Sequence, residues 1–155
     1  MTDWKLPWSA SCLCGRVTMQ VTQPPVISMA CHCRGCQKLT SGPYSLTLMI
    51  PESGFSVTSG ETIIGGLHRE DGRQHYCPHC LNWLYTMGPA LEGLVNFRAT
   101  MLDDATWVRP FIDTMAAERL PGVVSGAVRA YPAWPAESDH AELTQAYARD
   151  GAKPQ

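Results

Sequence analysis

The arrangement of its seven cysteines constrains this chain more than any other feature, because all seven fall into three short clusters. The clusters are Cys12-x-Cys14, Cys31-x-Cys33-x-x-Cys36 and Cys77-x-x-Cys80. An odd number cannot pair completely in disulfides, and cytosolic thiols stay reduced. Two or three thiolates from one short turn can instead face a single ion. The spacing therefore predicts metal binding. The alternatives are plain buried cysteines or a redox CxxC motif, which usually accompanies a βαβ pattern that is not found here.

Ligand arithmetic divides the seven cysteines into four and three. Zinc bound by thiolates is usually tetrahedral, and structural sites fill all four positions while catalytic sites leave one open. In this division Cys12, Cys14, Cys77 and Cys80 hold a structural zinc. The middle cluster then binds a second zinc and leaves its fourth position for water, a substrate thiol or another side chain. We therefore expect two Zn²⁺ ions per chain.

Other arrangements of ligands remain open at this point. Cys31 can join the CxxC turn while Cys33 and Cys36 join the CxC turn. A histidine can also close the three-cysteine site and make it structural. The candidates for this role are His32, His75 and His79.

An open zinc site has chemistry that suits one class of reaction. A coordinated thiol is held as its thiolate, and a coordinated carbonyl is polarised. The addition of a thiol to a small aldehyde uses both abilities. The middle cluster of Cys31, Cys33 and Cys36 is therefore the candidate catalytic centre, acting through its zinc.

Short segments separated by turns predict a mainly β fold with few short helices. Thirteen glycines and twelve prolines are spread along the 155 residues, which suffice for one domain over 1–155. Alternation and turn signals predict strands within 14–25, 26–31, 44–50, 54–70, 73–88 and 91–104, and helical turns over 34–41. Residues 1–10 are interpreted as a loose lead-in and 107–131 are unassigned. Residues 136–155 are interpreted as a short helix or a mobile tail.

Charge and hydropathy exclude several functional classes. The formal net charge is -2, which gives no support to a nucleic-acid groove or to binding at an anionic membrane surface. No apolar run approaches the roughly 20 residues of a membrane helix, and the amino terminus lacks the pattern of a signal peptide. We therefore expect a cytoplasmic protein.

Four motifs in a fixed order carry a family resemblance. The pieces SCLCGRVTMQV, CHCRGCQKLTSGPYSLTLMIP, YCPHC and MLDD lie between residues 11 and 104. Together they resemble the family of glutathione-dependent formaldehyde-activating enzymes, also called the GFA or CENP-V domain. The resemblance implies a zinc-binding, tent-like β fold (the β-tent). It also implies a carbon–sulfur lyase that works on glutathione and formaldehyde and gives S-hydroxymethylglutathione. By position, the four-cysteine set matches the family's structural zinc and the three-cysteine set its catalytic zinc.

The chain departs from the family pattern at two places. Leu81 follows the CxxC motif where the family usually has glycine, and residues 99–103 read ATMLD in place of Gly-Thr-Leu-Asp. Both changes leave the metal ligands intact. They fall in segments that can form the walls of a substrate pocket, so they bear on the identity of the substrate.

Other side chains have a functional and a structural interpretation. His32 is a candidate to line the second site, although such a residue more often points away from it. Arg34 and Lys38 can attract a substrate carboxylate, although solvated charges are commoner. Asp103 and Asp104 are interpreted as a turn pair. The predicted core aromatic residues are Trp83, Tyr85 and Phe97, and Trp107 and Trp134 are candidates to cover a pocket.

Two rival functions remain beside the enzyme. A non-catalytic zinc module that binds a protein partner predicts no turnover and a second site closed by a histidine. A thiol redox sensor predicts reversible disulfides and zinc release under mild oxidant.

Overall fold

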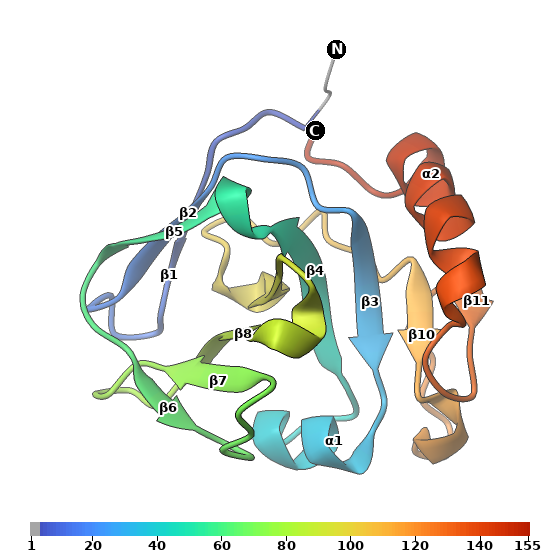
Figure 1. Cartoon of the computed structure of the whole chain (residues 1–155), viewed down its shortest axis with the longest axis horizontal. Helices are drawn as coiled ribbons and strands as arrows, with labels where there is room; N and C mark the ends of the chain where they lie inside the picture. The colour runs from blue at the N-terminus through green and yellow to red at the C-terminus, as the bar shows by residue number, and fades with distance from the viewer. Residues whose placement is uncertain (1–3) are drawn as a thin grey trace.

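Most of the regular structure in this chain is β-strand. The computed structural model describes residues 4–155, which form eleven strands and two α-helices (Figure 1). The mainly β fold class predicted from the sequence is confirmed. A small sheet has the strand order β1-β2-β5, and both of its strand pairs are antiparallel. Its strands are β1 (Trp8–Ser11), β2 (Thr18–Val21) and β5 (Phe55–Ser59).

The larger sheet has eight strands in the order β11-β10-β3-β4-β9-β8-β7-β6. They are β3 (Ile27–Cys31), β4 (Ser45–Pro51), β6 (Ile63–Gly65), β7 (Arg73–Tyr76), β8 (Trp83–Met87), β9 (Leu94–Arg98), β10 (Ile112–Thr114) and β11 (Arg129–Ala130). The strand β10 runs parallel to both of its neighbours, and the other pairs are antiparallel.

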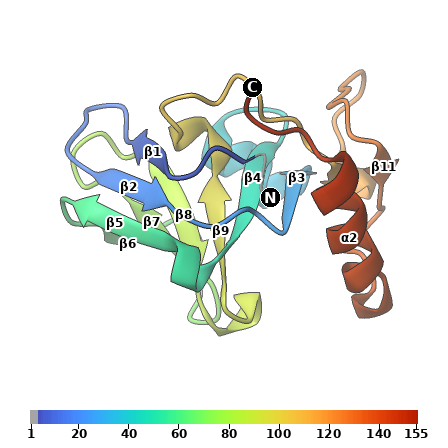
Figure 2. The same cartoon turned by 90° about the horizontal axis from the view of Figure 1, so that it is seen from above.

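The small sheet lies beside the large one (Figure 2), and the hydrophobic core includes side chains from both sheets. Alternation along β4 and β9 places Leu48, Ile50, Val95 and Phe97 on one face, and all four are fully buried. The ring centroid of Phe55 on β5 lies 4.8 Å from that of Tyr85 and 5.7 Å from that of Phe97. Aromatic packing of this kind joins the small sheet to the large one. The predicted core residues Trp83, Tyr85 and Phe97 are all buried.

The opposite face of the large sheet carries the side chains that matter for the site. Residues paired directly across neighbouring strands point to the same face. The register therefore places eleven residues on one side, which we call the cysteine face. They are Ile27, Met29 and Cys31 of β3, Ser45, Thr47 and Met49 of β4, Leu94, Asn96 and Arg98 of β9, and Ile112 and Thr114 of β10.

Two α-helices and five single turns of 3₁₀-helix complete the described chain. The helices are α1 (Arg34–Thr40) and α2 (His140–Asp150). The turns are η1 (Glu52–Gly54), η2 (Pro89–Leu91), η3 (Ala99–Met101), η4 (Ala116–Glu118) and η5 (Glu137–Asp139). Leu143, Ala146 and Tyr147 make the buried side of α2, within the segment interpreted as a short helix or a mobile tail. None of the helices within residues 4–155 has the length and apolar character needed to cross a bilayer.

Three strands were not predicted from the sequence. The strand β1 lies in the segment interpreted as a lead-in, where Trp8 and Ala10 are buried beside β2. The strands β10 and β11 lie in the unassigned region 107–131. Their partners are distant in sequence, since Ile112 of β10 pairs with Met29 of β3. No local alternation reveals such a short parallel pairing.

Candidate metal centres

The four cysteines of the CxC and CxxC motifs form one cluster. All four Sγ atoms lie within 4.8 Å of one another. The Sγ of Cys14 lies 3.6 Å from that of Cys12 and 3.7 Å from that of Cys77. Four zinc–sulfur bonds of about 2.3 Å at tetrahedral angles put sulfurs about 3.8 Å apart, whereas a disulfide needs about 2 Å. The spacing and the all-sulfur donor set fit a closed tetrahedral metal site, with Cys80 as the fourth ligand.

Two backbone turns present these sulfurs to one another. The N–H of Gly15 donates to the carbonyl of Cys12 at 2.9 Å, and the N–H of Leu81 donates to the carbonyl of Cys77 at 3.0 Å. Asn82 joins the two turns, because its Oδ1 accepts a 2.7 Å hydrogen bond from the N–H of Leu13. The cluster therefore holds β1 and β2 of the small sheet beside β7 and β8 of the large one.

The electrostatics of this cluster favour an ionised sulfur at Cys12. Burial raises the pKa of this thiol, but hydrogen bonds from the N–H of Val17 and from the neighbouring thiols lower it to about 6. The N–H of Val17 lies 3.3 Å from the Cys12 Sγ. Thiolate is the form that binds metal, so the fold prepares this ligand.

Cys31, Cys33 and Cys36 form the second cluster, and their Sγ atoms also lie within 4.8 Å of one another. Cys33 is the N-cap of α1, where its Sγ accepts from the N–H of Cys36 at 3.2 Å. Ser45 of β4 donates its hydroxyl to the Sγ of Cys36 at 3.1 Å. Among residues 4–155, no ligand atom of histidine, aspartate or glutamate joins this group. The seven cysteines are thus grouped as four and three, and the mixed partitions do not occur.

The three thiols of this cluster share their protons unequally. Hydrogen bonds from Cys31 and then Cys36 lower the pKa of Cys33. Contacts with Cys31 and then Cys33 raise the pKa of Cys36, and the contact with Cys33 raises that of Cys31. One thiolate therefore forms readily at Cys33, while ionisation of all three sulfurs requires nearby positive charge.

Arg98 supplies such a charge, and sequence reasoning missed it. Its side chain is buried on β9, with 4% of the residue exposed. Burial lowers the pKa of Arg98 to about 10, and the negative charge of Cys36, Cys31 and Cys33 raises it in return. The guanidinium stacks on the ring of Trp83 and donates from Nη2 to Thr47 Oγ1. A buried cation therefore lies close enough to the three-cysteine cluster to favour its thiolate forms.

His32 lies between two cysteines of the cluster but contacts a carboxylate. It is fully buried, and its Nε2 lies 2.8 Å from Oδ1 of Asp113 on β10. The same carboxylate accepts from Arg119 Nη2 at 2.6 Å and from Ser125 Oγ at 2.6 Å. Asp113 lies between Ile112 and Thr114 on β10, so its side chain points to the face of the sheet opposite the cysteine face. The hydrogen bond to Asp113 therefore holds the His32 ring on that opposite face, away from the sulfurs.

Buried polar atoms without partners are found on the cysteine face. Within residues 4–155, the unpartnered atoms include Oγ1 of Thr114 and Nε and Nη1 of Arg98, and both residues belong to this face. Thr114 pairs directly with Cys31 across the β3–β10 ladder. Buried polar groups are normally hydrogen-bonded, and exceptions mark functional positions. This concentration distinguishes the second cluster as the candidate active site.

The remaining predicted residues lie outside the two clusters. His75 stacks on Tyr85 and its Nδ1 lies 2.9 Å from Thr62 Oγ1. The exposed side chains are those of Arg34, Lys38, His68, His79 and Asp103. Asp104 accepts from the N–H of Thr106 at 3.0 Å, which is a turn contact as predicted.

Three comparisons place the chain among known proteins. No curated protein matches it. A crystal structure of a Rhodobacter sphaeroides protein is similar, with a TM-score of 0.53 and 14% sequence identity over 79% of this chain and 99% of that one. At this identity the likeness concerns the fold alone. The profile of the glutathione-dependent formaldehyde-activating enzymes (GFA) matches residues 7–117, which include all seven cysteines. The chain therefore belongs to the GFA family.

Proposed function

We propose that this protein is a zinc-dependent carbon–sulfur lyase that acts on the adduct of a thiol and an aldehyde. Glutathione and formaldehyde, which form S-hydroxymethylglutathione, are the first pair to test because the family is named for them. The observation that carries the proposal is the three-cysteine cluster. It has three sulfur ligands and no fourth ligand from histidine, aspartate or glutamate among the described residues.

The two clusters take different roles in this proposal. Cys12, Cys14, Cys77 and Cys80 hold a structural zinc, and Cys31, Cys33 and Cys36 hold a second zinc with an open position, giving two Zn²⁺ per chain. The second zinc, when bound, supplies thiolate binding and Lewis-acid polarisation of a carbonyl. Sulfur-rich donor sets of this kind favour zinc over magnesium or calcium.

The protein's own residues prepare the site for this chemistry. Arg98 offsets the negative charge of the three thiolates, and Ser45 holds the sulfur of Cys36 by its 3.1 Å hydrogen bond. In adduct formation, the thiol sulfur bonds to the carbonyl carbon and the thiol proton ends on the carbonyl oxygen; the lyase direction reverses both changes. The unpartnered Oγ1 of Thr114, which pairs with Cys31 across the sheet, is a group available to exchange a hydrogen bond with that oxygen.

The direct test measures exchange between free glutathione and its formaldehyde adduct by NMR. Zinc-loaded protein should accelerate exchange above the spontaneous rate. Cys36→Ser should lose the acceleration and about one zinc per chain while it keeps the far-ultraviolet circular dichroism of the parent, because the four-cysteine site is untouched. Undiminished acceleration by Cys36→Ser protein that lacks the second zinc would contradict the mechanism.

The same samples separate the rival functions. A protein that holds two zincs but accelerates no thiol–aldehyde pair fits a non-catalytic interaction module. Reversible disulfides with zinc release under mild oxidant fit a thiol redox sensor.

A further inference from the structure

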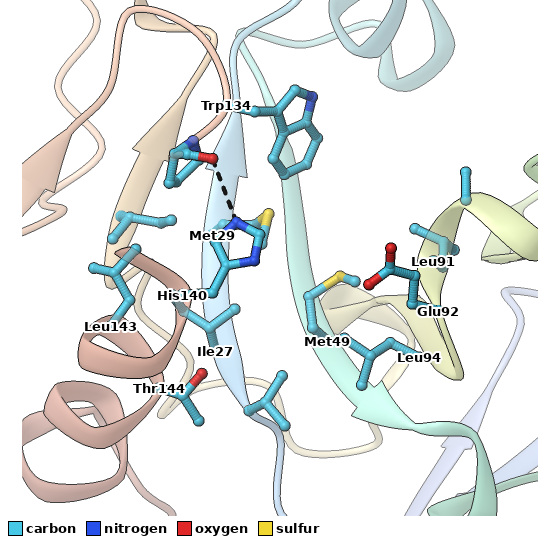
Figure 3. A pocket seen from close by; sticks show the side chains of 14 residues that line it. Ile27, Met29, Met49, Leu91, Glu92, Leu94, Trp134, His140, Leu143 and Thr144 are labelled. Atoms are coloured by element: carbon cyan, nitrogen blue, oxygen red, sulfur yellow. Dashed lines mark hydrogen bonds between the residues drawn. The ribbon is translucent and has the colours of Figure 1, made fainter. Parts of the chain in front are cut away.

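An apolar pocket opens on the large sheet beside α2 (Figure 3). Its volume is about 470 Å³, which falls in the range of small-molecule sites. Apolar walls include Ile27, Met29, Met49, Leu91, Leu94 and Leu143. Figure 3 shows Met29 and Met49 on neighbouring strands, with Leu143 of α2 on one side and Leu91 on the other. Trp134 also lines the pocket, and 55% of this tryptophan is exposed.

The floor of the pocket and the three-cysteine cluster share one face of the sheet. Ile27, Met29, Met49, Leu94 and Ile112 line the pocket, and all five belong to the cysteine face. Cys31 is two positions beyond Met29 on β3, which corresponds to about 7 Å along a strand. The end of the pocket at Met29 therefore lies within the length of a small molecule from Cys31.

The cysteine face changes character along this path. Near the cluster it carries Ser45, Thr47 and Arg98, which are polar and buried. Farther along the same strands it carries Ile27, Met49 and Leu94, which line the pocket. Such a face suits a ligand with a polar reacting end and an apolar body.

The pocket does not suit the charged parts of glutathione. No lysine or arginine is among its lining residues, its histidine His140 contacts the carbonyl of Pro135 through Nε2, and the exposed Glu92 adds a carboxylate to the lining. Carboxylates of a bound ligand would lie in an apolar pocket without a lysine or arginine partner, which is unfavourable. When glutathione is the thiol, the apolar group therefore comes from the other component of the adduct, the aldehyde.

We propose that this pocket binds an alkyl or aromatic group carried by the aldehyde carbon of the substrate. The proposal rests on the proposed function. It identifies larger, apolar aldehydes, rather than formaldehyde, as the preferred carbonyl substrates. The reaction with a larger aldehyde is the same as with formaldehyde. One carbon–sulfur bond forms or breaks, one proton moves between sulfur and oxygen, and no electron donor or acceptor takes part. Unbranched Met29 and Met49 side chains can adapt to groups of different shape.

Kinetics with a series of aldehydes tests this specificity. At fixed glutathione, kcat/KM of the zinc-loaded protein should rise from formaldehyde through propanal to pentanal, by about fourfold for each methylene that the pocket buries. Benzaldehyde should also exceed formaldehyde. A series with apolar thiols and formaldehyde tests the other source of the apolar group. A rise confined to that second series, or equal values throughout the first, would overturn the proposal.

Two variants place the effect in the pocket. Leu91→Asp puts a short charged side chain on the wall and should lower kcat/KM for pentanal about tenfold, a loss comparable to that of one to two buried methylenes, with formaldehyde unaffected. Leu120→Asp is the matched control, because Leu120 is also partly exposed but lies outside the lining. Thr144→Phe fills the pocket from α2 and should exclude benzaldehyde while propanal is still accepted. Equal effects of Leu91→Asp and Leu120→Asp would contradict the assignment.

A binding measurement separates this proposal from the proposed function. Protein labelled with [methyl-¹³C]methionine is titrated with benzyl alcohol, and the Met29 and Met49 signals are assigned with Met→Leu variants. Selective shifts of these two signals, even without turnover of any aldehyde, support the pocket and reject the lyase. Turnover of formaldehyde with glutathione, no shift of either signal and no preference for larger aldehydes support the lyase and reject the pocket.

Discussion

The guanidinium carbon of Arg98 lies 3.9 Å from the centre of the Trp83 ring, so a buried cation is stacked on an indole face. None of the ion pairs found among residues 4–155 gives Arg98 a carboxylate partner. The nearby negative charges are instead those of Cys36, Cys31, Tyr76 and Cys33 when ionised. The stacking holds the planar cation in place and leaves its charge available to the sulfurs.

Replacing this cation should weaken metal retention at the three-cysteine cluster. In Arg98→Met, the three thiolates lose a buried positive charge, and the apparent zinc affinity should fall by about tenfold or more. Competition with chelators of graded affinity measures the change. Arg34→Met is the control, because Arg34 is next to Cys33 in sequence but is exposed and screened by solvent. Equal zinc affinities in Arg98→Met and the parent would show that the cation does not act on the cluster.

Asp113 should matter for stability more than for zinc content or activity. In Asp113→Asn, His32 loses its carboxylate partner and Arg119 its ion pair, both on the face opposite the cysteine face. We expect about 2 kcal/mol of lost stability, with two zincs and kcat retained. Metal analysis, urea unfolding and adduct kinetics measure the three quantities. Asp103→Asn changes an exposed carboxylate and should alter none of them.

Loss of a ligand should have opposite consequences in the two clusters. Cys12→Ser removes a buried ligand from the site that joins the two sheets, and a structural zinc contributes folding energy directly. We expect this variant to unfold or aggregate, whereas Cys36→Ser remains folded and loses activity. Soluble yield and thermal unfolding followed by circular dichroism distinguish them. A normally folded, soluble Cys12→Ser protein would refute the structural role.

Leu81 offers a test of stored backbone strain. It has a φ of 58° in the turn after the CxxC motif, and its side chain is 62% exposed. A leucine in the left-handed region is strained, whereas glycine adopts it freely. Leu81→Gly should therefore stabilise the zinc-loaded protein by up to about 1 kcal/mol. Urea unfolding measures the difference.

The control for this change is Leu13→Gly in the CxC turn. Leu13 is 84% exposed but is not among the non-glycine residues with positive φ. Glycine there only increases the freedom of the unfolded chain, so stability should fall slightly. A gain in both variants would point to the loss of an exposed side chain rather than to the relief of strain.

The sequence predicts the local parts of this structure well. The cysteine clusters, the turn at Cys77 to Cys80 and the helix α1 each depend on a few adjacent residues, so spacing and capping reveal them. The alternation in 44–50 and 91–104 likewise predicts β4 and β9. Ligand arithmetic favours the grouping of cysteines into four and three because zinc prefers tetrahedral sites, but it leaves mixed partitions open, and the positions of the sulfurs decide between them.

The surroundings of the three-cysteine cluster could not be predicted in this way. Arg98 and Thr114 reach the cluster only because β9 and β10 pair in a particular register with β4 and β3. Neither β9 nor β10 carries a sequence motif that identifies the strand with which it pairs. The contact between Asp113 and His32 is equally non-local, because 81 positions separate the two residues. A buried arginine within LVNFR is a local signal, since a charge in an apolar strand requires partners, but it does not identify them.

The four-cysteine cluster also sets the order of events during synthesis. The sulfurs of Cys14 and Cys77 lie 3.7 Å apart although 63 positions separate them in the chain. Closing a loop of that length costs about 4 kcal/mol of chain entropy, and no contact offsets this cost until the loop is closed. Cys12 and Cys14 leave the ribosome long before Cys77 and Cys80 are synthesised. A metal ion bound at that stage would have only two of its four sulfur ligands. The completed cluster therefore forms late, and a metal bound there would fasten a β fold that the strands have already brought together.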